Sequence, residues 1–240
     1  TLSGKRDSRR LIVSGTSAAG RAFDLNRFAK LTPASDLVSI DSDGFIVPQK
    51  VGRTTVKVTV GKKSVDVPVE VKDVTDHPVS FIREVIPVIS KVGCNAGTCH
   101  GAQKGKGGFT LSLRGYDPLF DYRALVDDLS GRRFNRSRPE QSLMLLKPTQ
   151  GVPHEGGFLF DETSRVYSIF KQWIAEGCRF DTAKRVARIE VFPKKPLLET
   201  TESRQQLIVI AHFPDGSSRD VTREAVYGSS DFEVATVSKS

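Results

Sequence analysis

The sequence contains few sulfur-containing and few aromatic residues. Its 240 residues include 3 cysteines, 1 methionine and 1 tryptophan, and aromatic residues make up 8%. Three cysteines are too few for a disulfide-dense scaffold, and an odd number leaves at least one without an internal partner. No run of about eighteen or more apolar residues occurs, so no membrane segment is expected. The N-terminus has no apolar stretch of signal-peptide length, so the chain is expected to be a mature or excised fragment.

Basic residues exceed acidic residues. Lysine and arginine number 36 against 28 for aspartate and glutamate, which gives a formal net charge of +8. Such a balance favours acidic partners. Nucleic acid is not expected among them, because the basic segments lack interleaved aromatic residues and match no nucleic-acid-binding module. With 38% hydrophobic residues, the chain is expected to fold and to bury a core.

One stretch of the sequence occurs twice. The segment LIVSGTSAAGRAFDLNRFA, which starts at position 11, aligns without a gap with LIVIAHFPDGSSRDVTREA, which starts at position 207, a constant offset of 196. Seven of the nineteen aligned positions are identical, among them Gly20 with Gly216 and Asp24 with Asp220. The repeat predicts that one kind of module occurs twice, with something different between the copies.

The segments around the two copies have the pattern of β-strands. In TTVKVTV (54–60), Val56, Val58 and Val60 alternate with polar residues, as in a strand with one buried face. Turn signals such as Asp-Gly separate several such runs, which predicts a small antiparallel β-sandwich. These segments resemble bacterial immunoglobulin-like domains of group 2 over 10–72 and 189–240. The resemblance implies a spacer or binding module in each place, with strands missing from the second.

Between the copies, the hydrophobic period changes from that of strands to that of helices. Asp117 before a proline predicts a helix start, and Ser137 lies three residues before Glu140, the spacing of a capping box. A core built from short helices and glycine-rich loops is thin, so this region is expected to need something else to pack around. The four predicted helices cover 77–93, 117–129, 137–147 and 163–178.

The most specific chemical signal lies in this middle region, where Cys94, Cys99 and His100 stand close together in the sequence. A c-type haem needs two thiols that reach the vinyl groups of one porphyrin edge, and a histidine beside the second thiol. The usual motif is C-x-x-C-H, whereas four residues separate the cysteines here, and these are expected to bulge outward. A Cys94–Cys99 disulfide, a zinc site completed by His154 and a reactive dithiol are the alternatives that the motif leaves open.

The sequence around this motif resembles a known family. The run from His77 to Gly177 is similar to the cytochrome-c-like domain of large planctomycete secreted proteins, which also carry group 2 immunoglobulin-like domains. More distantly it resembles class I cytochrome c, with a helix before the motif, a middle helix beginning Pro-Glu-x-Ser-Leu, and a closing helix. The resemblance implies one covalent haem c, thioether bonds to Cys94 and Cys99, and His100 as the proximal iron ligand. It also implies an extracytoplasmic location.

The second axial ligand of the iron is predicted from position in the chain. In class I cytochromes it is a methionine in a loop after the middle helix. The one methionine of this chain, Met144, lies inside a predicted helix, where its periodicity indicates core packing. The loop GVPHEGG holds His154 instead, so His154 is the predicted distal ligand. Met144 and an open or water-bound position are the alternatives. Ligation by two histidines predicts a low reduction potential.

Other candidate residues have simpler interpretations. His77 and His212 are expected to be surface residues, and Cys178 is expected to be a buried free thiol. The segment GRRFNRSR (131–138) contains four arginines, which are expected to be solvated unless they contact haem propionates or an acidic redox partner.

The predicted fold class is a multidomain α and β chain, with a small all-α class I cytochrome c-like domain between two immunoglobulin-like sandwich modules. The predicted domains are 1–74, 75–183 and 184–240. In this fold the first and last helices cross, which would place Phe81 near Trp173. The predicted function is electron transfer to a redox partner by one covalent haem c, without enzymatic activity. The alternatives are a haem enzyme or gas sensor with an exchangeable ligand, and a non-haem structural or surface-binding module.

Overall fold

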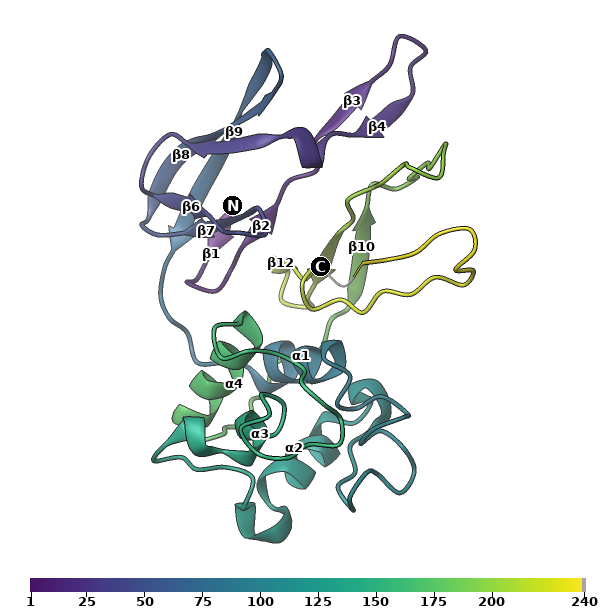
Figure 1. Ribbon diagram of the computed structural model, residues 1–240. Helices are drawn as coiled ribbons and strands as arrows, with labels where there is room; N and C mark the ends of the chain where they lie inside the picture. The colour runs from purple at the N-terminus through teal and green to yellow at the C-terminus, as the bar shows by residue number, and fades with distance from the viewer. Residues whose placement is uncertain (239–240) are drawn as a thin grey trace. The chain divides into compact units, whose positions relative to one another are not determined.

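The computed structural model describes residues 1–238 and divides into two compact units (Figure 1). Unit 1 contains Thr1–His77 and Val186–Arg223, together with the residues from Thr236 on. Unit 2 contains Pro78–Arg185 and Glu224–Ala235. The segments on either side of the chain's middle therefore combine in one unit.

The largest sheet of unit 1 has four strands in the order β1-β9-β8-β5. The long strands β8 (Gly52–Val60) and β9 (Lys63–Asp73) form an antiparallel hairpin, closed by the tight turn between Val60 and Lys63. On its two sides, β5 (Lys30–Pro33) pairs antiparallel with β8, and β1 (Leu2–Ser3) pairs parallel with β9.

A second sheet of unit 1 has the order β2-β7-β6, with strands Arg9–Arg10, Phe45–Pro48 and Val38–Ile40. Apolar side chains of both sheets form one core, and the alternation predicted for 54–60 is confirmed where Val56 and Val58 are buried. The buried members of this core are Leu2, Val38, Ile46, Val56, Val69 and Val71.

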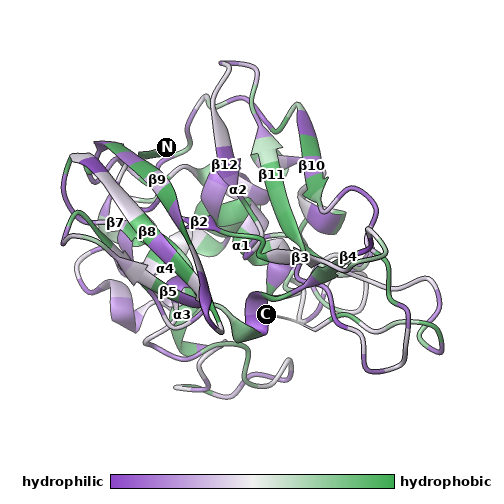
Figure 2. Cartoon of the chain, turned by 90° about the horizontal axis from the view of Figure 1, so that it is seen from above, coloured by the Kyte–Doolittle hydropathy of each residue, from purple (hydrophilic) through white to green (hydrophobic). Residues whose placement is uncertain are grey.

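The sequence repeat forms the same hairpin twice in unit 1. In the first copy, β3 (Ser14–Thr16) pairs with β4 (Ala22–Asp24). In the second, β11 (Ile208–His212) pairs with β12 (Ser218–Asp220), and Figure 2 shows β11 as hydrophobic along most of its length. One further strand, β10 (Arg188–Phe192), pairs with the other side of β11.

The two hairpins agree residue by residue at the offset of 196. Leu25 N–H donates to Val13 C=O at 2.8 Å, and at the equivalent positions Val221 N–H donates to Val209 C=O at 2.8 Å. The turn glycine has φ 77° at Gly20 and 81° at Gly216. The prediction of a repeated unit is thus confirmed for this hairpin. The cross-strand pairs of the first hairpin are Ser14–Asp24, Gly15–Phe23 and Thr16–Ala22. The equivalent pairs of the second hairpin, in the same order, are Ile210–Asp220, Ala211–Arg219 and His212–Ser218.

Unit 2 consists of short helical segments joined by loops. The first begins with a π-helical turn, η2 (Phe81–Val85), which runs directly into α1 (Ile86–Lys91) with Pro87 in the first turn of α1. The other α-helices of the described chain are α2 (Pro118–Val126), α3 (Leu143–Leu146) and α4 (Arg165–Ala175). Single turns of 3-10 helix occur at Asn26–Phe28 in unit 1 and at Leu113–Gly115, Asp128–Gly131 and Pro139–Gln141 in unit 2.

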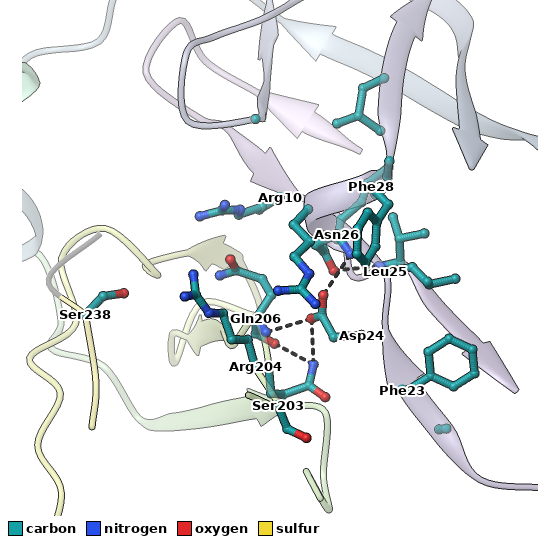
Figure 3. Close-up of a pocket in the computed structure, with 18 of the residues that line it drawn as sticks. Arg10, Phe23, Asp24, Leu25, Asn26, Phe28, Ser203, Arg204, Gln206 and Ser238 are labelled. Atoms are coloured by element: carbon teal, nitrogen blue, oxygen red, sulfur yellow. Dashed lines mark hydrogen bonds between the residues drawn. The ribbon is translucent and has the colours of Figure 1, made fainter. Parts of the chain in front are cut away.

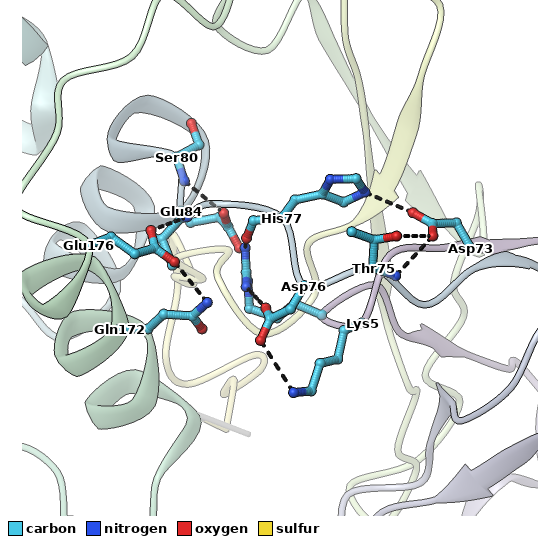
Figure 4. A network of polar contacts seen from close by, with 11 residues as sticks. Lys5, Asp73, Thr75, Asp76, His77, Ser80, Glu84, Gln172 and Glu176 are labelled. Atoms are coloured by element: carbon cyan, nitrogen blue, oxygen red, sulfur yellow. Dashed lines mark hydrogen bonds and ion pairs between the residues drawn. The ribbon is translucent and has the colours of Figure 1, made fainter.

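Capping side chains set the starts of several helices. Asp117 accepts hydrogen bonds from the N–H groups of Leu119 and Phe120, which confirms it as the N-cap of α2. Ser80 accepts from Arg83 N–H, and its own N–H donates to the buried Glu84 carboxylate at 2.9 Å (Figure 4).

The capping box predicted at 137–140 is wrong. Helix α3 starts later, after Ser142, and the side chain of Ser142 makes no capping bond to it. The Ser142 hydroxyl instead accepts a hydrogen bond from Asn135 N–H at 3.0 Å.

The core of unit 2 contains a cluster of aromatic rings. Trp173 and Phe81 are fully buried, and their rings lie 5.2 Å apart between centroids, which confirms their predicted proximity. Phe134 meets the same tryptophan edge-on at 5.4 Å. Pairs of this kind stabilise a core beyond the area they bury.

The predicted fold class is wrong. Strands make up most of the regular structure of residues 1–238 and lie in four separate sheets, and the four α-helices are all short, from α3 with 4 residues to α4 with 11. A small all-α class I cytochrome domain between two sandwiches is not what these elements form. Prolines and positive-φ glycines interrupt the helical pattern after one to three turns, and much of the chain between helices is irregular.

The end of β9 carries a compact polar cluster (Figure 4). The Asp73 carboxylate accepts hydrogen bonds from Thr75 N–H at 2.9 Å and from its hydroxyl at 2.6 Å, and it binds His77 Nε2 at 2.7 Å. These bonds lower the pKa of Asp73 to about 2, and the two bonds from Thr75 have the largest effect.

Asp73 is therefore expected to titrate near pH 2, about two units below an unperturbed aspartate. A lowered pKa in the folded state means that this contribution to stability is present above about pH 4 and is lost as the pH falls toward 2. NMR titration of the side-chain carboxyl measures the value directly, and the Thr75→Val variant should move it upward. A titration near pH 4 in the wild-type protein would contradict the prediction.

Candidate functional site

Four of the predicted site residues line one pocket of unit 2. Cys94, His100, Met144 and His154 surround a cavity of about 220 Å³. Cys99 does not line it. The remaining wall is apolar or basic, formed by Lys106, Gly107, Phe109, Leu111, Leu125, Leu129, Arg132, Arg133, Leu143, Lys147 and Pro148.

The segment between the two cysteines is a compact double turn. Helix α1 ends at Lys91, and Gly93, two residues later, has a φ of 84°, the left-handed conformation that glycine favours just after a helix. Ala96 N–H then donates to Gly93 C=O, and Cys99 N–H to Ala96 C=O, both at 3.0 Å. A hydrogen bond that spans six residues, from His100 N–H to Cys94 C=O at 2.9 Å, closes the segment. The four intervening residues are therefore held in hydrogen-bonded turns, which joins Cys94 and His100 in one small motif.

A buried asparagine fixes this double turn to its surroundings. Asn95 is 1% exposed, and its side-chain amide donates to Ser90 Oγ at 2.8 Å. Its backbone carbonyl accepts from Arg114 N–H at 3.1 Å. A Cβ atom on Gly101 would lie 2.1 Å from the same carbonyl oxygen, so no larger residue fits there without moving the backbone.

Both histidines are oriented by backbone carbonyls. His100 Nδ1 lies 3.0 Å from Phe109 C=O, and His154 Nδ1 lies 3.0 Å from Gly157 C=O. A carbonyl oxygen only accepts, so these bonds assign a proton to Nδ1 in each ring, and in the neutral form of the ring the lone pair is then on Nε2. A carbonyl bonded to the second ring nitrogen is the usual support of a metal-ligating histidine.

Burial keeps His100 uncharged. It lowers the pKa of the imidazole, and the nearby His154 adds to that effect. Only a neutral imidazole has a lone pair for a metal. The ring also packs against Phe109, with 4.6 Å between centroids.

The thiols of Cys94 and Cys99 are both free. No disulfide joins Cys94 to Cys99. Burial, followed by the effect of Cys99, raises the pKa of the Cys94 thiol to about 12. A zinc site would need the thiolates. Within residues 1–238, no group of three or more His, Cys, Asp or Glu side chains is arranged to hold a metal ion. A haem iron, in contrast, takes four ligands from the porphyrin and needs only one or two from the protein.

Basic side chains occupy part of the pocket wall. The Arg133 guanidinium stacks over the Phe109 ring at 4.1 Å and donates to Ala124 C=O at 3.0 Å. Burial lowers the pKa of Arg133. Lys106 pairs with the exposed Glu155 at 3.6 Å. With Arg132 and Lys147, the lining holds four cationic side chains and no carboxylate, an environment suited to an anionic group on a bound molecule.

Met144 projects from α3 into the same pocket. It is partly buried and also packs against the core of unit 2, as its helical spacing predicts. Both candidates for the distal position, Met144 and His154, therefore lie at the cavity.

The other residues singled out from the sequence lie elsewhere. His77 binds Asp73, and His212 binds Glu190 at 2.9 Å. Cys178 is fully buried, and burial raises the pKa of its thiol. None of these side chains lines the pocket. Sequence analysis missed Phe109, whose carbonyl and ring both contact His100; its position directly after the glycine-rich segment 105–108 was the available signal.

A larger cavity of about 890 Å³ lies in unit 1 (Figure 3). Asp24 is central to it and accepts hydrogen bonds from Gln206 N–H at 2.7 Å and from Gln205 Nε2 at 3.0 Å. Its lining includes four arginines and four carboxylates but no cysteine or histidine. This cavity therefore lacks the thiol and imidazole groups that line the smaller pocket.

Among the helices of the described residues, none combines the length and the apolar character needed to cross a bilayer. No family model, curated protein or solved structure matches the chain.

Proposed function

We propose that the pocket of unit 2 binds one haem c and that the chain transfers electrons through it. Cys94 and Cys99 would form the thioether bonds, His100 would be one axial ligand, and His154 the other. The observation that carries the proposal is that two histidines, each anchored through Nδ1 by a backbone carbonyl, line one largely apolar pocket. The sequence resemblance over 77–177 points the same way.

The residues present fit this group in kind. Two imidazoles provide axial ligands, apolar side chains such as Leu111 and Leu125 exclude water, and Arg132 and Arg133 suit the propionates. The cavity of about 220 Å³ is smaller than the roughly 300–1,000 Å³ of pockets that enclose drug-sized ligands. Loading therefore requires part of the wall to move, and Gly107, in a segment with three positive-φ glycines, belongs to that wall.

Covalent attachment needs no oxidant. Each thiol adds across one vinyl group, so that sulfur bonds to one carbon and hydrogen to the other. The bound haem would supply one-electron chemistry. With haem bound, Cys94 would hold the ring from the pocket wall and Cys99 from just outside it, burial would favour the neutral form of His100, and the four cationic side chains of the wall would be available to its anionic groups. Attachment of this kind supports an extracytoplasmic location, and the basic wall supports an acidic redox partner.

Production of the protein together with a haem-attachment system tests the proposal. The expected product retains one haem per chain on a denaturing gel and gives a pyridine haemochrome spectrum typical of two thioether bonds. Cys94→Ala and Cys99→Ala should each shift that spectrum, and the double variant should lose covalent haem. Cys178→Ala, which removes a thiol outside the pocket, is the matched control. Wild-type protein that stays colourless beside a cytochrome loaded in the same cells would overturn the proposal.

A further inference from the structure

The two copies of the hairpin in unit 1 differ in one respect, which is the number of strands that pair with them. In the second copy, β11 pairs with β12 on one side and with β10 on the other. In the first copy, β4 is the only strand among residues 1–238 that pairs with β3. The edge of β3 that corresponds to the β10 side of β11 therefore has no strand beside it in the described structure.

Backbone groups of β3 point to that edge. Val13 and Ser17 exchange hydrogen bonds with the β4 side, through Leu25 N–H to Val13 C=O and Ser17 N–H to Arg21 C=O. Alternate residues of an antiparallel strand face opposite edges, so Ser14 and Thr16 direct their N–H and C=O groups away from β4. Both residues are exposed. In the second copy, the equivalent Ile210 and His212 face Glu190 and Arg188 of β10.

This edge lacks two of the features that keep exposed edges from pairing. Natural edge strands are blunted by short length, by charged residues and by proline, and β3, although only 3 residues long, has neither of the last two. The outer strand of the second copy, β10, has Arg188 and Glu190 within it and Pro193 and Lys194 directly after it. The segment 11–20, which contains β3, has no charged residue and no proline. The first copy is thus open to pairing at the position where the second copy already holds a strand.

The hairpin is also preformed for a partner strand. The ring of Phe23, 47% exposed, covers the bare backbone of Gly15, where an added Cβ would lie 2.7 Å from it.

We propose that the free edge of β3 binds an extended segment of another protein, antiparallel to β3 and with alternating apolar residues like those of β10. Main-chain hydrogen bonds would supply the affinity, as in other cases of strand addition. A second copy of this chain is a poorer source, because its β10 is already paired with its own β11. The proposal is independent of the haem, since every residue involved belongs to unit 1.

A labelled peptide with the sequence of residues 187–193 is the probe, and binding is measured by fluorescence anisotropy. Thr16→Pro removes an N–H from the free edge and is expected to weaken binding by about tenfold or more. Ala22→Pro is the matched control, because Ala22 is the cross-strand neighbour of Thr16 and its N–H points to the opposite edge. Ala22→Pro should bind the peptide as the wild type does.

Hydrogen exchange on the wild-type protein keeps the test valid even if a proline variant fails to fold. Peptide binding should slow exchange at the Ser14 and Thr16 amides and leave Ala22 unchanged. No binding, or protection at Ala22 instead, would overturn the proposal. A concentration-dependent dimer that Thr16→Pro abolishes would also overturn it, because the occupant would then be a second copy of the chain.

Discussion

Replacing His154 with alanine is expected to change the absorption spectrum of the haem-loaded protein from low-spin to high-spin. His154 Nδ1 is held by Gly157 C=O, so Nε2 is the atom that would bind the iron under the proposed function. Alanine has no atom to replace it, so the iron would lose a strong axial ligand. The reduced variant should also bind carbon monoxide readily, whereas the wild type should resist it. This prediction rests on the proposed function.

Two further variants make the result specific. His77→Ala removes an exposed histidine that pairs with Asp73 outside the pocket, and it should leave the spectrum unchanged. Met144→Leu retains the volume and apolar character of the side chain but removes the sulfur. A spectrum that changes in Met144→Leu and not in His154→Ala would assign the sixth position to methionine. Wild-type protein that binds carbon monoxide as readily as His154→Ala would favour the haem enzyme or gas sensor over electron transfer.

Local signals in the sequence predicted those parts of the fold and of the candidate site that depend on residues close together in the chain. Asp117 was identified as a helix cap because capping involves only the next three positions. The repeated hairpin was found because a turn glycine and an aspartate recur at a fixed offset. His100 and His154 were chosen for their positions relative to the cysteines and glycines, and the structure brings both to one cavity.

The prediction that was wrong and the contacts that were missed depend on residues distant from one another in the sequence. The fold class was inferred from helical periodicity in the middle of the chain, but periodicity does not say how long a helix persists, and α3 extends for only 4 residues. The stacking of Arg133 on Phe109 follows from how two loops meet. Phe109 reaches His100 through turns at glycines with positive φ, and nothing in the amino-acid pattern specifies the direction of those turns.

Trp173→Ala is expected to cost unit 2 about 3–5 kcal/mol of its free energy of unfolding. The indole is fully buried in α4, in ring contact with Phe81 and Phe134, so alanine would leave a large cavity in an already thin core. The indole N–H also donates to Arg179 C=O at 2.9 Å, and its loss leaves that carbonyl without its partner. This carbonyl lies just beyond α4, so the same side chain anchors the chain where the helix ends.

Urea unfolding followed by circular dichroism at the helical wavelength measures the change in the free energy of unfolding. The helical signal reports on unit 2, because unit 2 contains every helix of the described chain except one 3-10 turn. Trp173→Phe keeps most of the apolar volume but not the N–H group, so it should lose less stability than alanine. Phe158→Ala is the control, because Phe158 is 58% exposed and its removal should change stability by about 0.5 kcal/mol or less. If Trp173→Ala were as stable as Phe158→Ala, the aromatic cluster would not be the element that holds unit 2 together.

The pocket shares residues with this core, because Leu111 and Leu125 belong both to the core that contains Trp173 and to the wall beside His100. Loss of the indole should therefore also reduce haem retention by the assembled protein, and Phe158→Ala should not.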